Sequence, residues 1–163
     1  MSIDTLAIVE KHTLAGALKF QGACAKAKIK SIIGETVTVK GSVEYAVKLY
    51  VANEIGWQNL LRIHKNLHID NANEHVSEDV LLKNSGGLYM VFCSETNLSN
   101  SMPVFPDRYG FEGVYYQLDT VKYRSEKIDL EHLNRLKNYF HSFSKNLPLA
   151  LICDSYYLDQ EEN

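Results

Sequence analysis

The chain has 163 residues, of which 45% are hydrophobic and 23% are charged, and its formal net charge is −3. We expect residues 1–163 to form a single globular domain, because this length and composition are sufficient for one buried core. The charge balance gives no basic surface for nucleic acid, and no apolar run reaches the roughly 20 residues of a membrane span.

Strand and helix patterns alternate along the chain. Residues 6–9 form an apolar run, and Thr13 is placed to cap a helix that ends near Ala27. The later elements, in chain order, are predicted strands at 29–39 and 45–51, a helix from Asn53, a short helix from Ser77, a strand at 88–93, a long loop at 94–112, a strand at 114–118, a helix capped by Asp129 and a strand at 149–153. This alternation predicts an α/β fold with a largely parallel sheet, either open or closed into a barrel.

Polar groups follow three of the predicted buried strands. They are Glu10-Lys11-His12, Ser94-Glu95 and Asp154. In parallel sheets the carboxyl ends of the strands lie at one edge, where functional groups gather. We therefore expect these three sets to converge on one rim.

Other side chains favour structural roles. His64 and His68 are four residues apart, a spacing that can place two imidazoles on one metal ion, but they share the apolar stripe of Trp57 and Leu60. We interpret them as partly buried packing residues. The cysteines, Cys24, Cys93 and Cys153, are odd in number and lack metal-ligand spacing, which indicates reduced core residues of a cytoplasmic protein.

Several blocks of sequence resemble one family, in the same order. They are LAIVEKHTLAGALKF with IKSIIGETVTV, then YAVKLYVANEIGWQNLLRIH, LLKNSGGLYMVFC and PLALICDSYYLDQEE. They are similar to segments of the PHP (polymerase and histidinol phosphatase) domain of bacterial DNA polymerase III alpha subunits. That family has T-D-H-G after a strand, then I-I-G-C-E, Y-H-L with G-Y-x-N-L, and N-D-V-H.

The resemblance implies a distorted (β/α) barrel of the PHP type with a metal cluster at its carboxyl rim. We expect the barrel to be incomplete and to lack the first strand, because the family's opening H-x-H strand has no counterpart here. The chain also departs from the family at the ligand positions. Lys11 stands at a ligand His, Thr36 at the Glu with Glu35 one place early, and Ala46 at another His, whereas Asp154 is kept and Tyr156 replaces a His.

These replacements predict that the metal site is degenerate, because an ammonium repels a divalent cation. We expect no cofactor and no catalytic residue, and a vestigial rim of Glu10, Lys11, His12, Glu35, Asp154 and Tyr156. The hypothesis is that Lys11 neutralises Asp154 and Glu10, the two residues that would hold a metal if one were bound.

The resemblance implies a part in DNA replication, within a DNA-directed DNA polymerase (a nucleotidyltransferase). We expect this chain alone to be inactive, to pack against the rest of the polymerase subunit or a proofreading subunit, to meet DNA only through the full-length protein, to contact no membrane, and to self-associate in isolation. One alternative is an interaction module unrelated to replication. Another is a zinc- or manganese-dependent phosphoesterase or proofreading exonuclease that uses Glu10, His12, Glu35, Glu95 and Asp154.

Overall fold

The structure is a computed structural model that describes residues 3–41, 44–70, 74–93, 110–119 and 149–152. Its elements are β1 (Thr5–Lys11), α1 (Ala17–Ala27), β2 (Lys30–Lys40), β3 (Glu44–Val51), α2 (Glu54–Lys65), the π-helical turn η1 (Asn66–Asp70), β4 (Val76–Ser77), α3 (Glu78–Lys83), β5 (Leu88–Phe92), β6 (Gly113–Asp119) and β7 (Leu149–Ile152). The predicted helix at Asp129 and most of the predicted loop lie outside these residues. No helix in the described part is long and apolar enough to cross a bilayer.

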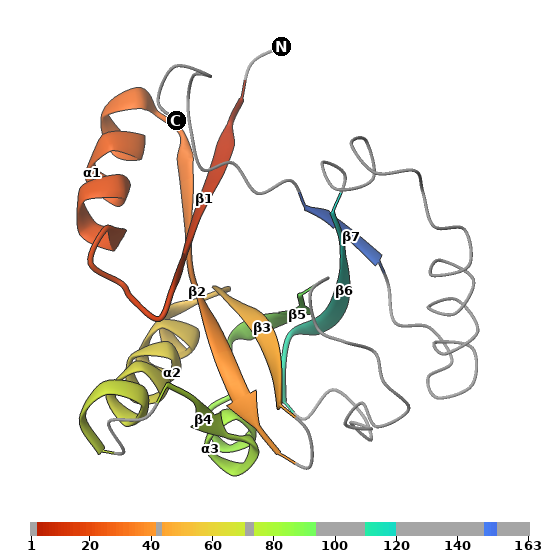
Figure 1. The fold of residues 1–163 in the computed structure, drawn as a ribbon. Coiled ribbons are helices and arrows are strands. Elements are labelled where there is room, and N and C mark those ends of the chain that lie inside the picture. Colours follow the sequence, from red (N-terminus) through yellow and green to blue (C-terminus); the bar gives the residue numbers. More distant parts are fainter. Residues whose placement is uncertain (1–2, 42–43, 71–73, 94–109, 120–148, 153–163) are drawn as a thin grey trace, which may run out of the picture.

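All seven strands belong to one twisted sheet (Figure 1). Six follow the order β1-β2-β3-β5-β6-β7, and β4 pairs with β2. The α/β class is thus confirmed. A closed barrel is not, because among the described strands β1 and β7 are the two ends of the order and do not pair with each other.

The expectation of a largely parallel sheet needs one correction. β1, β2, β5, β6 and β7 run in the same direction, but β3 is antiparallel to both of its neighbours. The reason is the short connection after β2 at Lys40-Gly41, since a parallel neighbour would need a crossover of a dozen residues or more. The carboxyl ends of β1, β5 and β7, which precede the three predicted polar sets, nevertheless point to one edge, because these strands run in the same direction.

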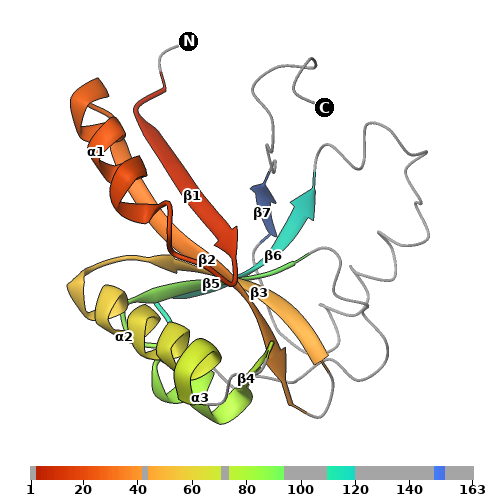
Figure 2. The same ribbon diagram turned by 60° about the vertical axis from the view of Figure 1, so that its left-hand side comes forward.

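The helices cover one side of this sheet, which we call the helix-facing side. α1 lies along β1 and β2, α2 packs on β3 and β5, and α3 packs on β2 and β4 (Figures 1 and 2). Alternate strand residues and one stripe along α2 and η1 form much of the core, with exposures from 0 to 2%: Val37, Val39, Val47, Leu49, Leu60, Ile63, Leu67, Leu88, Met90 and Phe92. Side chains alternate between the two faces along each strand, and paired residues of β2 and β3 share a face. Odd-numbered residues of β2 therefore lie on the helix-facing side, and even-numbered residues lie on the opposite face; we call this odd or even position the parity of a residue.

The position of α2 is fixed by close contacts with the segment that leads into β5. The Asn53 side chain caps α2 by accepting a hydrogen bond from the Gly56 amide at 3.0 Å. A Cβ on Gly56 would lie 1.8 Å from the Gly87 carbonyl oxygen, so only glycine permits this approach. Asn59 donates a hydrogen bond to the Gly86 carbonyl at 2.8 Å. These three contacts explain why the chain has Asn at 53, Gly at 56 and Asn at 59, one helical turn apart.

The start of α1 differs from the prediction. The helix begins at Ala17, its N-cap is Gly16, and no side chain caps it. Thr13 accepts a hydrogen bond from the Ala15 amide in the preceding turn instead. Glu10 accepts one from the Gly16 amide at 3.1 Å, so a carboxylate from β1 holds the beginning of the helix.

Candidate functional site at the carboxyl ends of β1 and β2

Two rows of paired residues cross the sheet where β1 ends. In one row Glu35 pairs with Glu10 on β1 and with Leu49 on β3. In the next row Thr36 pairs with Lys11 and with Lys48. Successive strand residues point to opposite faces, so the first row belongs to the helix-facing side and the second to the opposite face.

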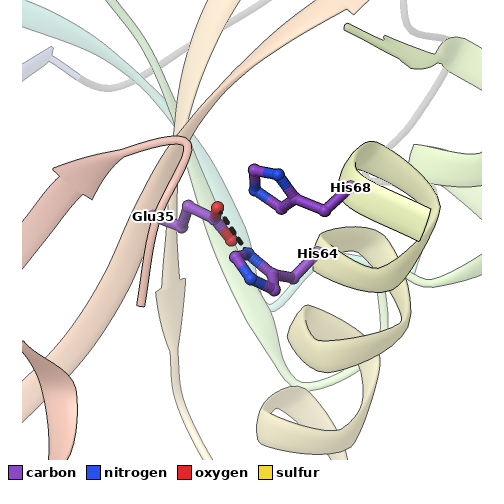
Figure 3. A group of neighbouring side chains, drawn as sticks. All are labelled: Glu35, His64 and His68. Carbon is purple, nitrogen blue, oxygen red and sulfur yellow. Dashed lines mark hydrogen bonds and ion pairs between the residues drawn. The ribbon is translucent and has the colours of Figure 1, made fainter. Parts of the chain in front are cut away.

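On the helix-facing side, Glu35 meets two histidines from α2 and η1. The Nδ1 atom of His64 lies 2.8 Å from Oε1 of Glu35. His68 follows one turn later, and its ring centroid is 4.3 Å from that of His64. Figure 3 shows both imidazoles directed at the carboxylate, and one donor atom from each of the three residues lies within 4.8 Å of the others. A carboxylate and two imidazoles are donors that bind divalent transition metal ions.

The carboxylate of Glu35 is in an unfavourable environment. Its side chain is fully buried, and within the described part of the chain its Oε2 atom has no hydrogen-bond donor. Burial raises the pKa of Glu35, while the hydrogen bond with His64 and the proximity of the His64 and His68 imidazoles act in the opposite direction. A positive charge beside Oε2 would therefore stabilise the ionised form.

His12 has a structural contact at the edge of β2. Its backbone has a φ of 53°, in the left-handed region, and its amide donates to the Thr36 carbonyl at 3.0 Å. The Nε2 atom accepts a hydrogen bond from the Thr38 amide at 3.2 Å. This imidazole thus pairs with the β2 backbone between the stretch covered by β1 and the stretch covered by β4.

The electrostatic surroundings of His12 favour its neutral form. Desolvation lowers the pKa of His12, and the nearby charges of Lys11 and His68 lower it further, while Glu74 raises it. A neutral ring is also what the contact with Thr38 requires, because Nε2 must keep its lone pair to accept.

The described residues of the predicted rim do not all lie on one face of the sheet. Glu10 and Glu35 face the helices, whereas Lys11 belongs to the opposite face and is exposed. Lys11 forms no ion pair with any described residue, so the expected pair with Glu10 is not formed. Its expected pair with Asp154 stays a prediction, because Ser94, Glu95, Asp154 and Tyr156 lie outside the described residues.

Comparison with known proteins identifies the family. The PHP domain family matches residues 1–147, so this chain belongs to that family. The chain is also similar to the DNA polymerase III subunit alpha of Staphylococcus aureus, with 32% identity over 92 residues in strains COL and NCTC 8325. That match covers 56% of this chain and 8% of each relative.

The family resemblance agrees with the geometry of the opposite face. The resemblance places Lys11, Thr36 and Ala46 at ligand positions of the family, and all three share the parity of that face: Lys11 pairs with Thr36, and Ala46 pairs with Thr38 two residues further along β2. The resemblance places Glu35 one residue before the position of the family's glutamate, and this offset puts Glu35 on the helix-facing side.

Sequence reasoning missed the pairing of Glu35 with His64 and His68. The histidines were assigned to packing, and Glu35 to the rim with Lys11. One signal was available: Glu35 has the same parity as Val37 and Val39 in a β-branched strand, which predicts a buried carboxylate in need of a partner. Which helix supplies that partner depends on how α2 lies across the sheet.

Proposed function

We propose that this chain is the PHP-type domain of a bacterial DNA polymerase III alpha subunit, with a structural role and without the family's catalytic metal cluster. Membership of the PHP family and the similarity to the S. aureus subunit support the assignment to replication, and with it a cytoplasmic location. The relatives are far longer than the matched segment, and primer extension is expected to belong to the rest of such a subunit.

The observation that supports loss of the metal cluster is the row of residues on the opposite face. Lys11 pairs with Thr36, and Thr36 pairs with Lys48, so two amino groups flank the position that corresponds to the family's glutamate. Divalent cations need several electron-pair donors that converge on one point, and a protonated lysine has no lone pair to offer. The barrel type is part of the same proposal.

The free edge of β1 supports a platform role. Among the described strands β1 pairs with β2 alone, and Ile3 and Leu6 are exposed by 63% and 40% near this edge. A free strand edge with apolar side chains pairs readily with another chain. We expect the remainder of the alpha subunit to cover this edge, and the isolated chain to self-associate through it.

Two measurements test this function. The chain mixed with an alpha-subunit body that lacks its own PHP domain is expected to form a complex in size-exclusion chromatography with light scattering, and Leu6→Lys is expected to weaken that complex. The chain supplied with zinc or manganese is expected to hydrolyse neither bis(4-nitrophenyl) phosphate nor the 3′ end of single-stranded DNA. Chelator-sensitive hydrolysis, or failure to bind the polymerase body, contradicts the proposal.

A further inference from the structure

A second group of donor atoms lies on the helix-facing side, away from the positions that correspond to the family's metal ligands. Glu35 comes from the middle of β2, His64 from the last turn of α2 and His68 from η1. Figure 3 shows the two rings on successive turns, with the carboxylate between them and the sheet. Neither histidine corresponds to a ligand position in the matched family blocks.

The Oε2 atom of Glu35 is the observation that points to a bound ligand. Oε2 of Glu35 is buried and has no donor among the described residues, although Oε1 has its partner in His64. A buried carboxylate oxygen without a partner is costly, and a bound cation satisfies it better than any neutral donor. His68 supplies a further imidazole to the same space, because one donor atom of His68 lies within 4.8 Å of those of Glu35 and His64.

The spacing of the donors suits a tetrahedral ion after small side-chain rotations. Zinc bonds of about 2.1 Å place neighbouring ligand atoms roughly 3.4 Å apart. The 2.8 Å contact between Glu35 and His64 must therefore open slightly, and donor atoms at the 4.8 Å limit must move closer. His68 is exposed and His64 is 28% exposed, which gives solvent access to the group.

We propose that Glu35, His64 and His68 bind one divalent transition metal ion of the zinc type, with water in the fourth position. Two imidazoles and a carboxylate are an established donor set for zinc, and three protein ligands leave one position open. The ion joins η1 and the end of α2 to β2, so it stabilises the fold. This site is independent of the proposed replication role and involves no residue of the opposite face.

The test is metal binding by the untagged chain after chelator dialysis. Isothermal titration with zinc chloride is expected to give one site per chain, and the melting temperature is expected to rise by about 5 °C at 100 times the Kd. Cobalt(II) is expected to give the visible absorption of a four-coordinate site without a thiolate charge-transfer band. No binding by the wild type, or a thiolate band from the cysteines, overturns the proposal.

Substitutions locate the ligands. His68→Gln is the main variant, because His68 is exposed and its loss leaves the core intact, and Glu35→Gln preserves the shape of the buried side chain. Each is expected to weaken zinc binding at least about tenfold, since even loss of a residue that only supports a ligand has that effect. His75→Gln, which removes a half-buried imidazole outside the group, is expected to bind as the wild type does. Unchanged affinity in His68→Gln, or equal loss in His75→Gln, contradicts the assignment.

Discussion

The two faces of the sheet where β1 ends differ in what they can bind, although their residues are adjacent in sequence. On the helix-facing side Glu35 meets His64 and His68, so a carboxylate and two imidazoles converge. On the opposite face Thr36 lies between Lys11 and Lys48. A shift of one residue along β2 therefore separates a set of metal donors from a row with two amino groups. The comparison shows that the pleat of the strand, as well as the residue type, decides which side chains can act together at one face.

The strongest way to disrupt the helix-facing side is to displace α2. Gly56→Ala places a methyl group against the Gly87 carbonyl, where a Cβ would lie at 1.8 Å, so we expect a loss of about 3 kcal/mol in the free energy of unfolding. Zinc binding is expected to weaken as well, because His64 and His68 move with the helix. Urea denaturation measures the stability.

Gly86→Ala is the matched control for that change. A Cβ on Gly86 would meet only the Asn59 amide at 3.5 Å and Ile55 at 4.0 Å, which are ordinary contacts. We expect a cost under about 1 kcal/mol. Equal losses in the two variants would show that the close approach at Gly56 is not what positions α2.

A smaller effect is expected at Asn59. This buried amide donates to the Gly86 carbonyl and accepts from Arg62 at 2.6 Å. Asn59→Ala leaves the carbonyl without its donor and is expected to cost about 1–2 kcal/mol. Arg62→Ala removes an exposed partner and is expected to change stability by less than about 0.5 kcal/mol. If thermal denaturation ranks the two variants in the reverse order, the hydrogen bond to Gly86 is not what holds this segment.

His12 provides a still smaller, pH-dependent effect at the boundary of the two faces. Its pKa is lowered in the folded state from the ordinary 6.5, so the unfolded chain binds the extra proton first. The contribution of His12 to the free energy of unfolding is therefore complete above pH 6.5 and falls as the pH drops below that value.

His12→Asn, which tolerates the left-handed backbone, is expected to reduce this pH dependence. Denaturation midpoints at pH 7.5 and pH 5.5 measure it in both proteins. Lys11, His68 and Glu74 also act on His12 and are unchanged in the variant. The same pH dependence in both proteins would show that His12 does not contribute to the change of the free energy of unfolding with pH.

No gain is expected from placing a histidine on the opposite face at the position that the resemblance assigns to a family ligand. Lys11→His returns an imidazole, but Thr36 and Ala46 still offer no strong metal ligand at the neighbouring positions. We expect neither phosphoester hydrolysis nor a second equivalent of bound zinc, as measured by a chromogenic assay and by titration. Chelator-sensitive hydrolysis by this variant would show that the site is nearly intact.

Most strands and helices could be predicted because the pattern of apolar and polar residues within each segment specifies them. Apolar and β-branched runs located β1, β2, β5, β6 and β7, and alternation located β3. The changes of pattern at Asn53 and Ser77 gave the starts of α2 and α3, and in the structure both residues are N-caps. The predicted start of α1 was wrong because Thr13 bonds to Ala15 in the turn before the helix, and Glu10 from β1 binds the amide of the N-cap Gly16. Such a contact between elements has no local signal.

The candidate site was harder to predict for the same reason. Lys11, Thr36 and Ala46 could be singled out by resemblance, since each falls at a family ligand position in the matching sequence blocks. The group of Glu35, His64 and His68 depends on the way α2 crosses β2 and on strand parity, and β2 and α2 are separated by the whole of β3. Spacing along the helix suggested a metal, but nothing in the helix identified the carboxylate.

The most direct test is anomalous diffraction at the zinc edge from crystals of the chain grown with zinc. We predict one strong peak between Glu35, His64 and His68, and none beside Lys11, Thr36 and Ala46. A peak on the opposite face next to Lys11, with none at Glu35, would contradict both proposals: the loss of the family's metal cluster and the zinc site at Glu35, His64 and His68.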